Sequence, residues 1–101
     1  MQDNKFSVSL ELEKSGEMIY FSQLDLSLIL QRSLRRTNLP NYFTQGFRPH
    51  IKISFQGALK LGKPGKIKAT FYFKKKLSLE KVITELNAQL PEGLKVREIS
   101  E

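Results

Sequence analysis

The chain of 101 residues carries 17 Lys and Arg against 10 Asp and Glu, which gives a formal net charge of +7 at pH 7. It has no cysteine and one histidine, so it lacks the ligands of disulfides, thiolate zinc sites and iron–sulfur clusters, and we expect neither a metal nor a cofactor. No apolar run approaches the roughly 20 residues of a membrane-spanning helix. We therefore expect one cytoplasmic domain over residues 1–101, not bound to a membrane, with an anionic partner.

The first predicted element is a strand. Apolar residues from Phe6 to Leu12 alternate with Ser and Glu, which is the period of a strand that buries one face. Residues 14–16 (Lys-Ser-Gly) signal a turn. Residues 18–21 (Met-Ile-Tyr-Phe) then predict a short extension of the strand.

A helix is predicted next, because residues 22–25 (SQLD) have the form of a capping box. It should run to about Thr37, since residues 38–40 (NLP) stop it. Its core-facing stripe consists of Leu26, Ile29, Leu30 and Leu34. Leu24 and Leu28 lie on the opposite side, so this helix is either covered twice or shows an apolar patch.

A loop over residues 40–49, rich in turn formers and aromatics, precedes two strands and a second helix. Alternation predicts the strands over 51–55 and 67–73, and 94–99 forms a last strand. Ser78 caps the second helix, whose apolar stripe is Leu79, Val82, Ile83, Leu86 and Leu90. The order β-α-β-β-α-β predicts an α+β, ferredoxin-like fold: a four-stranded antiparallel sheet with both helices on one face and the other face open.

Charge is polarised along the chain. Residues 26–79 contain twelve Lys or Arg and no acid, whereas the rest of the chain carries five basic and ten acidic side chains. Such a segment favours phosphate binding, and the planar fork of arginine suits a phosphate. The nucleic-acid-binding candidates are Arg32, Arg35 and Arg36 on the first helix, Arg48 and His50 in the loop, and the strand residues Lys52, Lys66 and Lys68.

The aromatic residues, Gly46 and His50 are expected to have mainly structural or phosphate-contacting roles. The strand KIKATFYF lacks the glycines of the RNA-recognition motif and leaves Tyr72 as its outward aromatic, so we expect contacts to phosphates rather than bases. Gly46 is expected to be a turn glycine with positive φ, and Phe43 and Phe47 to anchor the loop in the core. His50 should contact a phosphate or make a loop hydrogen bond. Because no nucleophile stands with a base, we name no catalytic residue.

Short motifs run through most of the chain: FSQLD (21–25), LRR (34–36), LP (39–40), QGFRPH (45–50), ISF (53–55), ALKLG (58–62) and LNAQLPEGL (86–94). The distinctive members are Ser22, Gln23, Asp25, Gln45, Gly46, Phe47 and Pro49. Together they resemble a bacterial radical-SAM-linked domain of unknown function, of which this chain is the first half or a short member. The resemblance implies an accessory module for a radical SAM partner that acts on RNA. Family members usually have His at the position of Gln23 and Glu near that of Lys68.

The leading hypothesis is a non-catalytic RNA-binding accessory domain that presents RNA to a modifying or processing enzyme. A second is a protein-interaction adaptor, in which Leu24 and Leu28 dock with the nearby arginines on an acidic partner surface. A third is a small metal-independent ribonuclease that uses His50 with Tyr20 or Tyr72. The sequence leaves the oligomeric state open.

Overall fold

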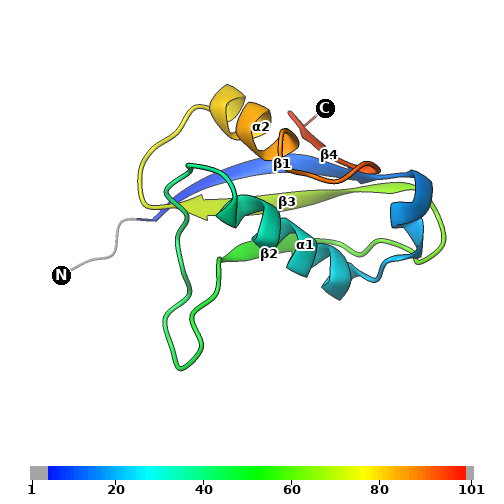
Figure 1. Ribbon diagram of the computed structural model, residues 1–101, viewed down its shortest axis with the longest axis horizontal. Coiled ribbons are helices and arrows are strands. Elements are labelled where there is room, and N and C mark those ends of the chain that lie inside the picture. The colour runs from blue at the N-terminus through cyan, green and yellow to red at the C-terminus, as the bar shows by residue number, and fades with distance from the viewer. Residues whose placement is uncertain (1–4, 100–101) are drawn as a thin grey trace.

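The computed structural model describes residues 5–99, which form a four-stranded sheet with helices packed on it (Figure 1). The elements in chain order are β1 (Phe6–Lys14), the 3-10 helix η1 (Gly16–Tyr20), α1 (Gln23–Arg35), β2 (Ile53–Gln56), β3 (Gly65–Phe73), α2 (Leu79–Asn87) and β4 (Leu94–Arg97). All strand pairs are antiparallel and the spatial order is β2-β3-β1-β4. The predicted α+β, ferredoxin-like arrangement is confirmed.

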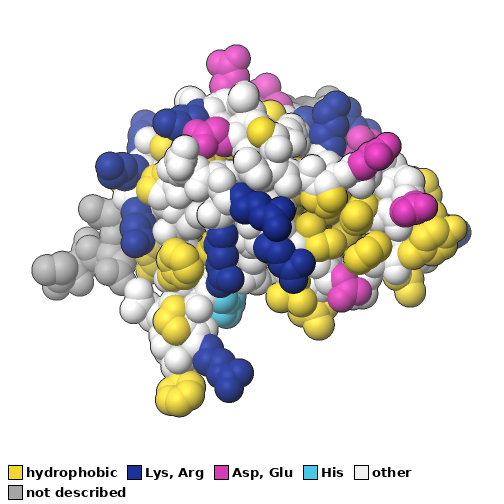
Figure 2. Space-filling view, in the orientation of Figure 1, with side chains coloured by type: hydrophobic (Ala, Val, Ile, Leu, Met, Phe, Trp, Pro, Cys, Tyr) yellow, Lys and Arg dark blue, Asp and Glu magenta, His cyan; other side chains and the backbone are white. Residues whose placement is uncertain are grey.

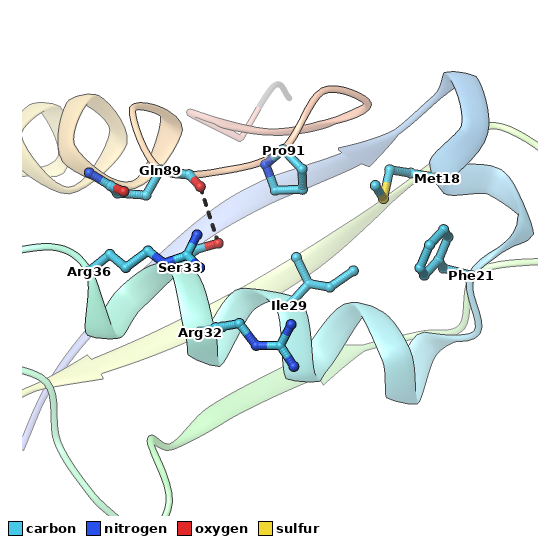
Figure 3. Close-up of a pocket in the computed structure, with 8 residues that line it drawn as sticks. All are labelled: Met18, Phe21, Ile29, Arg32, Ser33, Arg36, Gln89 and Pro91. Atoms are coloured by element: carbon cyan, nitrogen blue, oxygen red, sulfur yellow. Dashed lines mark hydrogen bonds between the residues drawn. The ribbon is translucent and has the colours of Figure 1, made fainter.

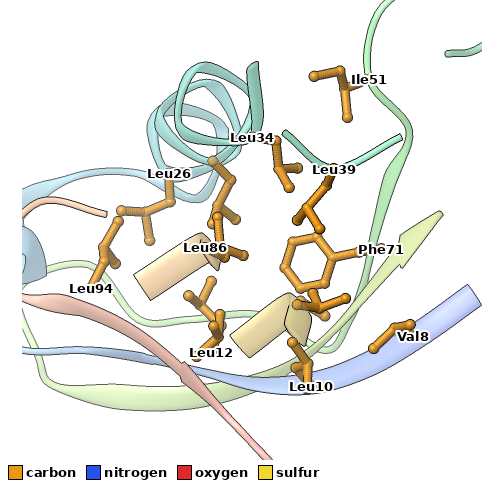
Figure 4. Packing of buried hydrophobic residues seen from close by; sticks show 14 of the residues in the cluster. Val8, Leu10, Leu12, Leu26, Leu34, Leu39, Ile51, Phe71, Leu86 and Leu94 are labelled. Carbon is orange, nitrogen blue, oxygen red and sulfur yellow. The ribbon is translucent and has the colours of Figure 1, made fainter. Parts of the chain in front are cut away.

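The two central strands, β1 and β3, bury alternate residues, as the sequence pattern predicts. Leu10 lies opposite Ala69 and Leu12 opposite Ile67, and all four side chains are buried. The helix residues in the same cluster are Leu26, Leu30 and Leu34 of α1 and Val82 and Leu86 of α2 (Figure 4). Because both helices pack on this face, the polar residues of the sheet line an open face on the other side.

The predicted strand extension over residues 18–21 is wrong, because these residues belong to η1 and the turn after it. At its end β1 already has β3 and β4 on its two edges, and Gly16, at φ +57°, turns the chain away from the sheet. Lys14, only 1% exposed, holds η1 in place. Its ammonium donates to the carbonyl of Ile19 at 3.3 Å and to that of Lys60 at 2.6 Å.

The start of α1 is built as predicted. Ser22 Oγ accepts a hydrogen bond from the Asp25 backbone N–H at 3.1 Å, and the Asp25 carboxylate accepts one from the Ser22 N–H at 3.2 Å. This reciprocal pair satisfies two backbone donors that would otherwise have no partner. The helix ends at Arg35, two residues before the predicted end, and the Thr37 hydroxyl donates to the Leu34 carbonyl at 2.6 Å.

Residues 41–52, which we call the finger, project beyond the sheet between α1 and β2 (Figure 1). The predicted strand over 51–55 begins only at Ile53, because Ile51 forms an isolated bridge with Phe43 in the other arm of the finger. A second bridge joins Asn41 to Phe73, at the end of β3. The predicted loop over residues 40–49 is thus tied to the edge of the sheet by two isolated bridges, at Asn41 and at Phe43.

The C-terminal elements are shorter than predicted. The helix α2, capped by Ser78 as expected, ends at Asn87, and Leu90 lies past its end against the core. The Asn87 side chain bonds both the N–H and the carbonyl of Val96, which fixes β4 beside α2. In the part of the chain that the structure describes, no helix has the length and apolar character needed to cross a bilayer.

Candidate functional site

The candidate lysines of β3 lie on the open face of the sheet, next to acids. In the β1–β3 register Lys66 faces Glu13 and Lys68 faces Glu11. The ammonium of Lys66 is 3.9 Å from the Glu11 carboxylate, which also pairs with Arg97 at 3.0 Å. The segment that is free of acids along the sequence is therefore not free of them in space, because antiparallel pairing brings β1 beside it.

Lys52 also points to the open face. Its ammonium lies 5.3 Å from the centre of the Tyr72 ring, and that of Lys5 lies 5.4 Å from the same centre. Both distances fall within the range of cation–π attraction. The Tyr72 hydroxyl is within 3.2 Å of Ser54 Oγ. The outward aromatic predicted for β3 is therefore present, but it is already in contact with two lysines and a serine.

The three candidate arginines of α1 lie on the helical side of the molecule, and all are exposed. The ion pairs within the described residues join Glu11 and Glu13 to Lys66 and Arg97, so none of these arginines has a carboxylate within 4 Å. Figure 2 shows Lys and Arg side chains gathered over α1, with a further one on the finger below. Cations in a last helical turn also stabilise the helix dipole, which gives them a structural role as well.

The arginines of α1 do not share one environment. At about 100° per residue, Arg35 lies about 60° around the helix from Arg32 and about 100° from Arg36. Arg32 and Arg36 line a pocket, whereas Arg35 is not among its lining residues. The eight predicted nucleic-acid-binding residues thus fall into three groups. Arg32, Arg35 and Arg36 lie on the helical side, Lys52, Lys66 and Lys68 lie on the open face of the sheet, and Arg48 and His50 lie in the finger beyond the sheet.

The tip of the finger carries an aromatic ring in water. Gly46 has φ +131°, so it is the turn glycine that the sequence predicts. The neighbouring Phe47 is 99% exposed, so the expectation that it anchors the loop in the core is wrong. Phe43 is 37% exposed, and the Lys74 ammonium lies 5.9 Å from its ring centre. Because it is 99% exposed, the ring of Phe47 has no packing role. Gly46 and Pro49 beside it are exposed too.

His50 makes loop hydrogen bonds, one of the two roles expected for it. Its ring nitrogen Nδ1 lies 3.3 Å from Thr44 Oγ1 and 3.3 Å from the Arg48 carbonyl oxygen. None of the hydrogen bonds given by the described residues joins His50 to Tyr20 or Tyr72. In Figure 1, η1, which carries Tyr20, lies at the opposite end of the molecule from the finger. The structure therefore does not bring Tyr20 together with His50.

The distinctive motif residues divide into a structural group and an exposed group. Ser22 and Asp25 form the helix cap. Gln23 holds the loop before β3, because its amide nitrogen donates to the Gly57 carbonyl at 3.4 Å and its oxygen accepts from the Leu59 N–H at 3.1 Å. The exposed group, at the finger tip, consists of Gln45, Gly46, Phe47 and Pro49. Exposed loop residues with no packing role are the stronger candidates for binding.

A pocket of about 380 Å³ lies between α1, η1 and the segment that joins α2 to β4. Figure 3 shows Met18 and Phe21 at one end, with Ile29 and Pro91 in the middle. The other lining residues are Arg32, Ser33, Arg36 and Gln89. Sequence reasoning missed this pocket, because its walls come from three separate segments. Leu24 and Leu28, the apolar pair on the outer side of α1, are not among its lining residues.

Within the described residues, no three His, Cys, Asp or Glu side chains are grouped so that they could hold a metal ion. A comparison with known protein families matches residues 8–101 to a family described as an uncharacterized protein conserved in bacteria (DUF2344). Neither a curated protein nor a solved structure matches the chain. Since the match covers most of the sequence, the chain belongs to this bacterial DUF2344 family.

Proposed function

We propose that this protein is a non-catalytic, cytoplasmic RNA-binding accessory domain that holds single-stranded RNA on the finger and on the end of α1 beside it. The observation that carries the proposal is the 99% exposure of Phe47 next to Arg48 at the tip of the finger. An exposed aromatic ring beside cationic side chains is the usual means of holding unpaired bases, since every base offers a face for stacking.

Electrostatics supports the same surface. The helix α1 ends at Arg35, with Arg36 as its cap, and the finger begins at Asn41. In the described structure these arginines have no ion-pair partner within 4 Å. Arginines that are not already paired can replace the counterions of a phosphate backbone, which drives binding and makes it salt-dependent. The resemblance to radical-SAM-linked domains extends the proposal to a radical SAM partner that modifies or processes the bound RNA.

The test compares two matched charge reversals by fluorescence anisotropy with labelled bulk tRNA and with duplex DNA. Arg35→Glu with Arg48→Glu alters the proposed surface, whereas Lys66→Glu with Lys68→Glu makes the same change in net charge on the open face of the sheet. We expect the first pair to lower tRNA affinity at least tenfold more than the second. Equal losses would mean that binding follows net charge alone, and the assignment to the finger would then be wrong.

A further inference from the structure

The pocket beside α1 has an apolar part and a charged rim. Met18, Phe21, Ile29 and Pro91 provide apolar walls, and its volume of about 380 Å³ can take a large side chain. The Ser33 hydroxyl on its wall is already engaged, because it donates to the Gln89 carbonyl at 3.5 Å (Figure 3). The apolar part therefore offers few free polar groups to an occupant.

Apolar surface continues from the pocket along the outside of α1. Leu24 and Leu28 are 71% and 50% exposed, and Tyr20, just before the helix, is 70% exposed. Leu24, Leu28 and Arg32 follow at intervals of four residues, so they form one row on the helix surface. Figure 2 shows hydrophobic side chains massed beside the Lys and Arg over α1. A contiguous exposed apolar patch of this kind marks an interaction site more often than a single exposed leucine does.

The arginines at the rim of the pocket have no acidic partner within the described part of the chain. The one acid of α1, Asp25, is engaged in the helix cap by its bond from the Ser22 N–H at 3.2 Å. In the described part of the chain no carboxylate lies within 4 Å of Arg32 or Arg36. An occupant that placed carboxylates at the rim would therefore meet two guanidinium groups without having to displace an existing ion pair.

We propose that the pocket receives a bulky apolar side chain of a partner protein, carried on a segment whose carboxylates pair with Arg32 and Arg36. Buried apolar anchors beside arginines dominate the binding energy of many protein interfaces. A protein segment fits better than RNA, because Leu24 and Leu28 offer a sugar–phosphate chain neither charge nor a hydrogen bond. The docking surface shares Arg36 with the proposed RNA surface, but its apolar part lies apart from the finger, so the proposal goes beyond the RNA binding and does not depend on it.

The direct test is a titration of isotope-labelled protein, followed by NMR, with three synthetic peptides of sequence EELFEE, EESSEE and QQLFQQ. The peptide with both acids and an apolar centre should shift the signals of Met18 and Ile29 saturably, and the other two should bind at least tenfold more weakly. The absence of a saturable shift with EELFEE would overturn the proposal. So would equal binding of EELFEE and EESSEE, which would indicate attraction by charge alone.

Substitutions around the pocket test whether the peptide binds there. Leu28→Ser, and Arg32→Glu with Arg36→Glu, should each weaken EELFEE at least tenfold, while the matched control Arg35→Glu should leave it within twofold. All four positions are exposed, so circular dichroism should stay unchanged. If bulk tRNA instead shifts Met18 and Ile29 while the peptides do not, the pocket belongs to an RNA surface and the docking proposal fails. If the finger proves not to bind tRNA, the proposed function fails, but the binding of EELFEE at the pocket is still expected.

Discussion

Thr44 and His50 close the loop at the tip of the finger. Thr44 Oγ1 accepts a hydrogen bond from the His50 backbone N–H at 3.2 Å and lies 3.3 Å from His50 Nδ1. The Thr44 N–H in turn donates to the His50 carbonyl at 2.8 Å. These contacts bring together the two ends of residues 45–49 and so set the direction in which Phe47 and Arg48 project. These hydrogen bonds within the chain restrain the tip of the finger, which lowers the entropic cost of binding.

Removing the Thr44 hydroxyl should loosen the finger without unfolding the domain. Thr44→Val keeps the side-chain volume but loses the side-chain bonds to His50, which at an exposed site should cost about 0.5–1.5 kcal/mol locally. We expect faster hydrogen exchange at the His50 amide and a several-fold loss of tRNA affinity. Thr70→Val, which removes a hydroxyl bonded to Ser9 on the open face of the sheet, is the control and should leave tRNA affinity unchanged. Equal effects of the two variants would argue against preorganisation.

The exposed ring of Phe47 should contribute to binding and not to folding. Phe47→Ala should weaken tRNA binding by about 1–3 kcal/mol, the usual contribution of one stacked base. Thermal unfolding should be unchanged, because a ring that is 99% exposed has no packing to lose. Phe47→Tyr, which keeps an aromatic face, should retain wild-type affinity. A drop in the melting temperature of Phe47→Ala would show that the ring packs in solution.

The buried ammonium of Lys14 should be important for stability. Lys14→Met retains most of the apolar length but leaves the Lys60 carbonyl without its donor, at a cost of about 1–3 kcal/mol for the unsatisfied group. The Ile19 carbonyl loses one donor and keeps the other, the Gly62 N–H at 2.7 Å. Urea unfolding should show this loss, whereas Lys63→Met, at an exposed position, should change stability by less than about 0.5 kcal/mol. Similar midpoints for the two variants would mean that water satisfies the Lys60 carbonyl.

Two glycines with positive φ should respond differently to an added methyl group. At Gly93, with φ +97°, a Cβ would lie 2.6 Å from the Ser15 carbonyl oxygen, which is a severe clash with backbone. At Gly46, with φ +131°, nothing lies within 4 Å of the same atom. Gly93→Ala should therefore combine backbone strain with a steric clash and destabilise the domain more than Gly46→Ala, as measured by chemical denaturation. The reverse order would contradict the packing of η1 against the start of β4.

The elements that the sequence predicts well are those set by local patterns. The capping box at Ser22 and the inward parity of Leu10 and Leu12 depend on neighbours in the chain, and the structure has both. The strand extension at Met18 failed because the local pattern does not show that both edges of β1 are occupied where it ends, by residues more than 50 positions away.

The parts of the candidate site that the sequence could not predict depend on contacts across the sheet. The lysine-rich pattern of β3 does not show that Glu11 and Glu13 stand opposite Lys68 and Lys66. Phe47 was expected in the core because an aromatic residue is buried more often than not, whereas the finger projects where no element covers it. The sequence could not predict the hydrogen bonds of Gln23 to Gly57 and Leu59, because they join segments that are far apart in the chain.

The most direct test of the account is ultraviolet cross-linking of the intact protein to labelled bulk tRNA, followed by mass spectrometry to identify the cross-linked peptide. Binding by the finger predicts cross-links within residues 41–52, centred on Phe47, that disappear in Phe47→Ala and persist after Lys66→Glu with Lys68→Glu. Cross-links centred on Tyr72 on the open face of the sheet, or none above the level seen with a neutral control protein, would contradict it.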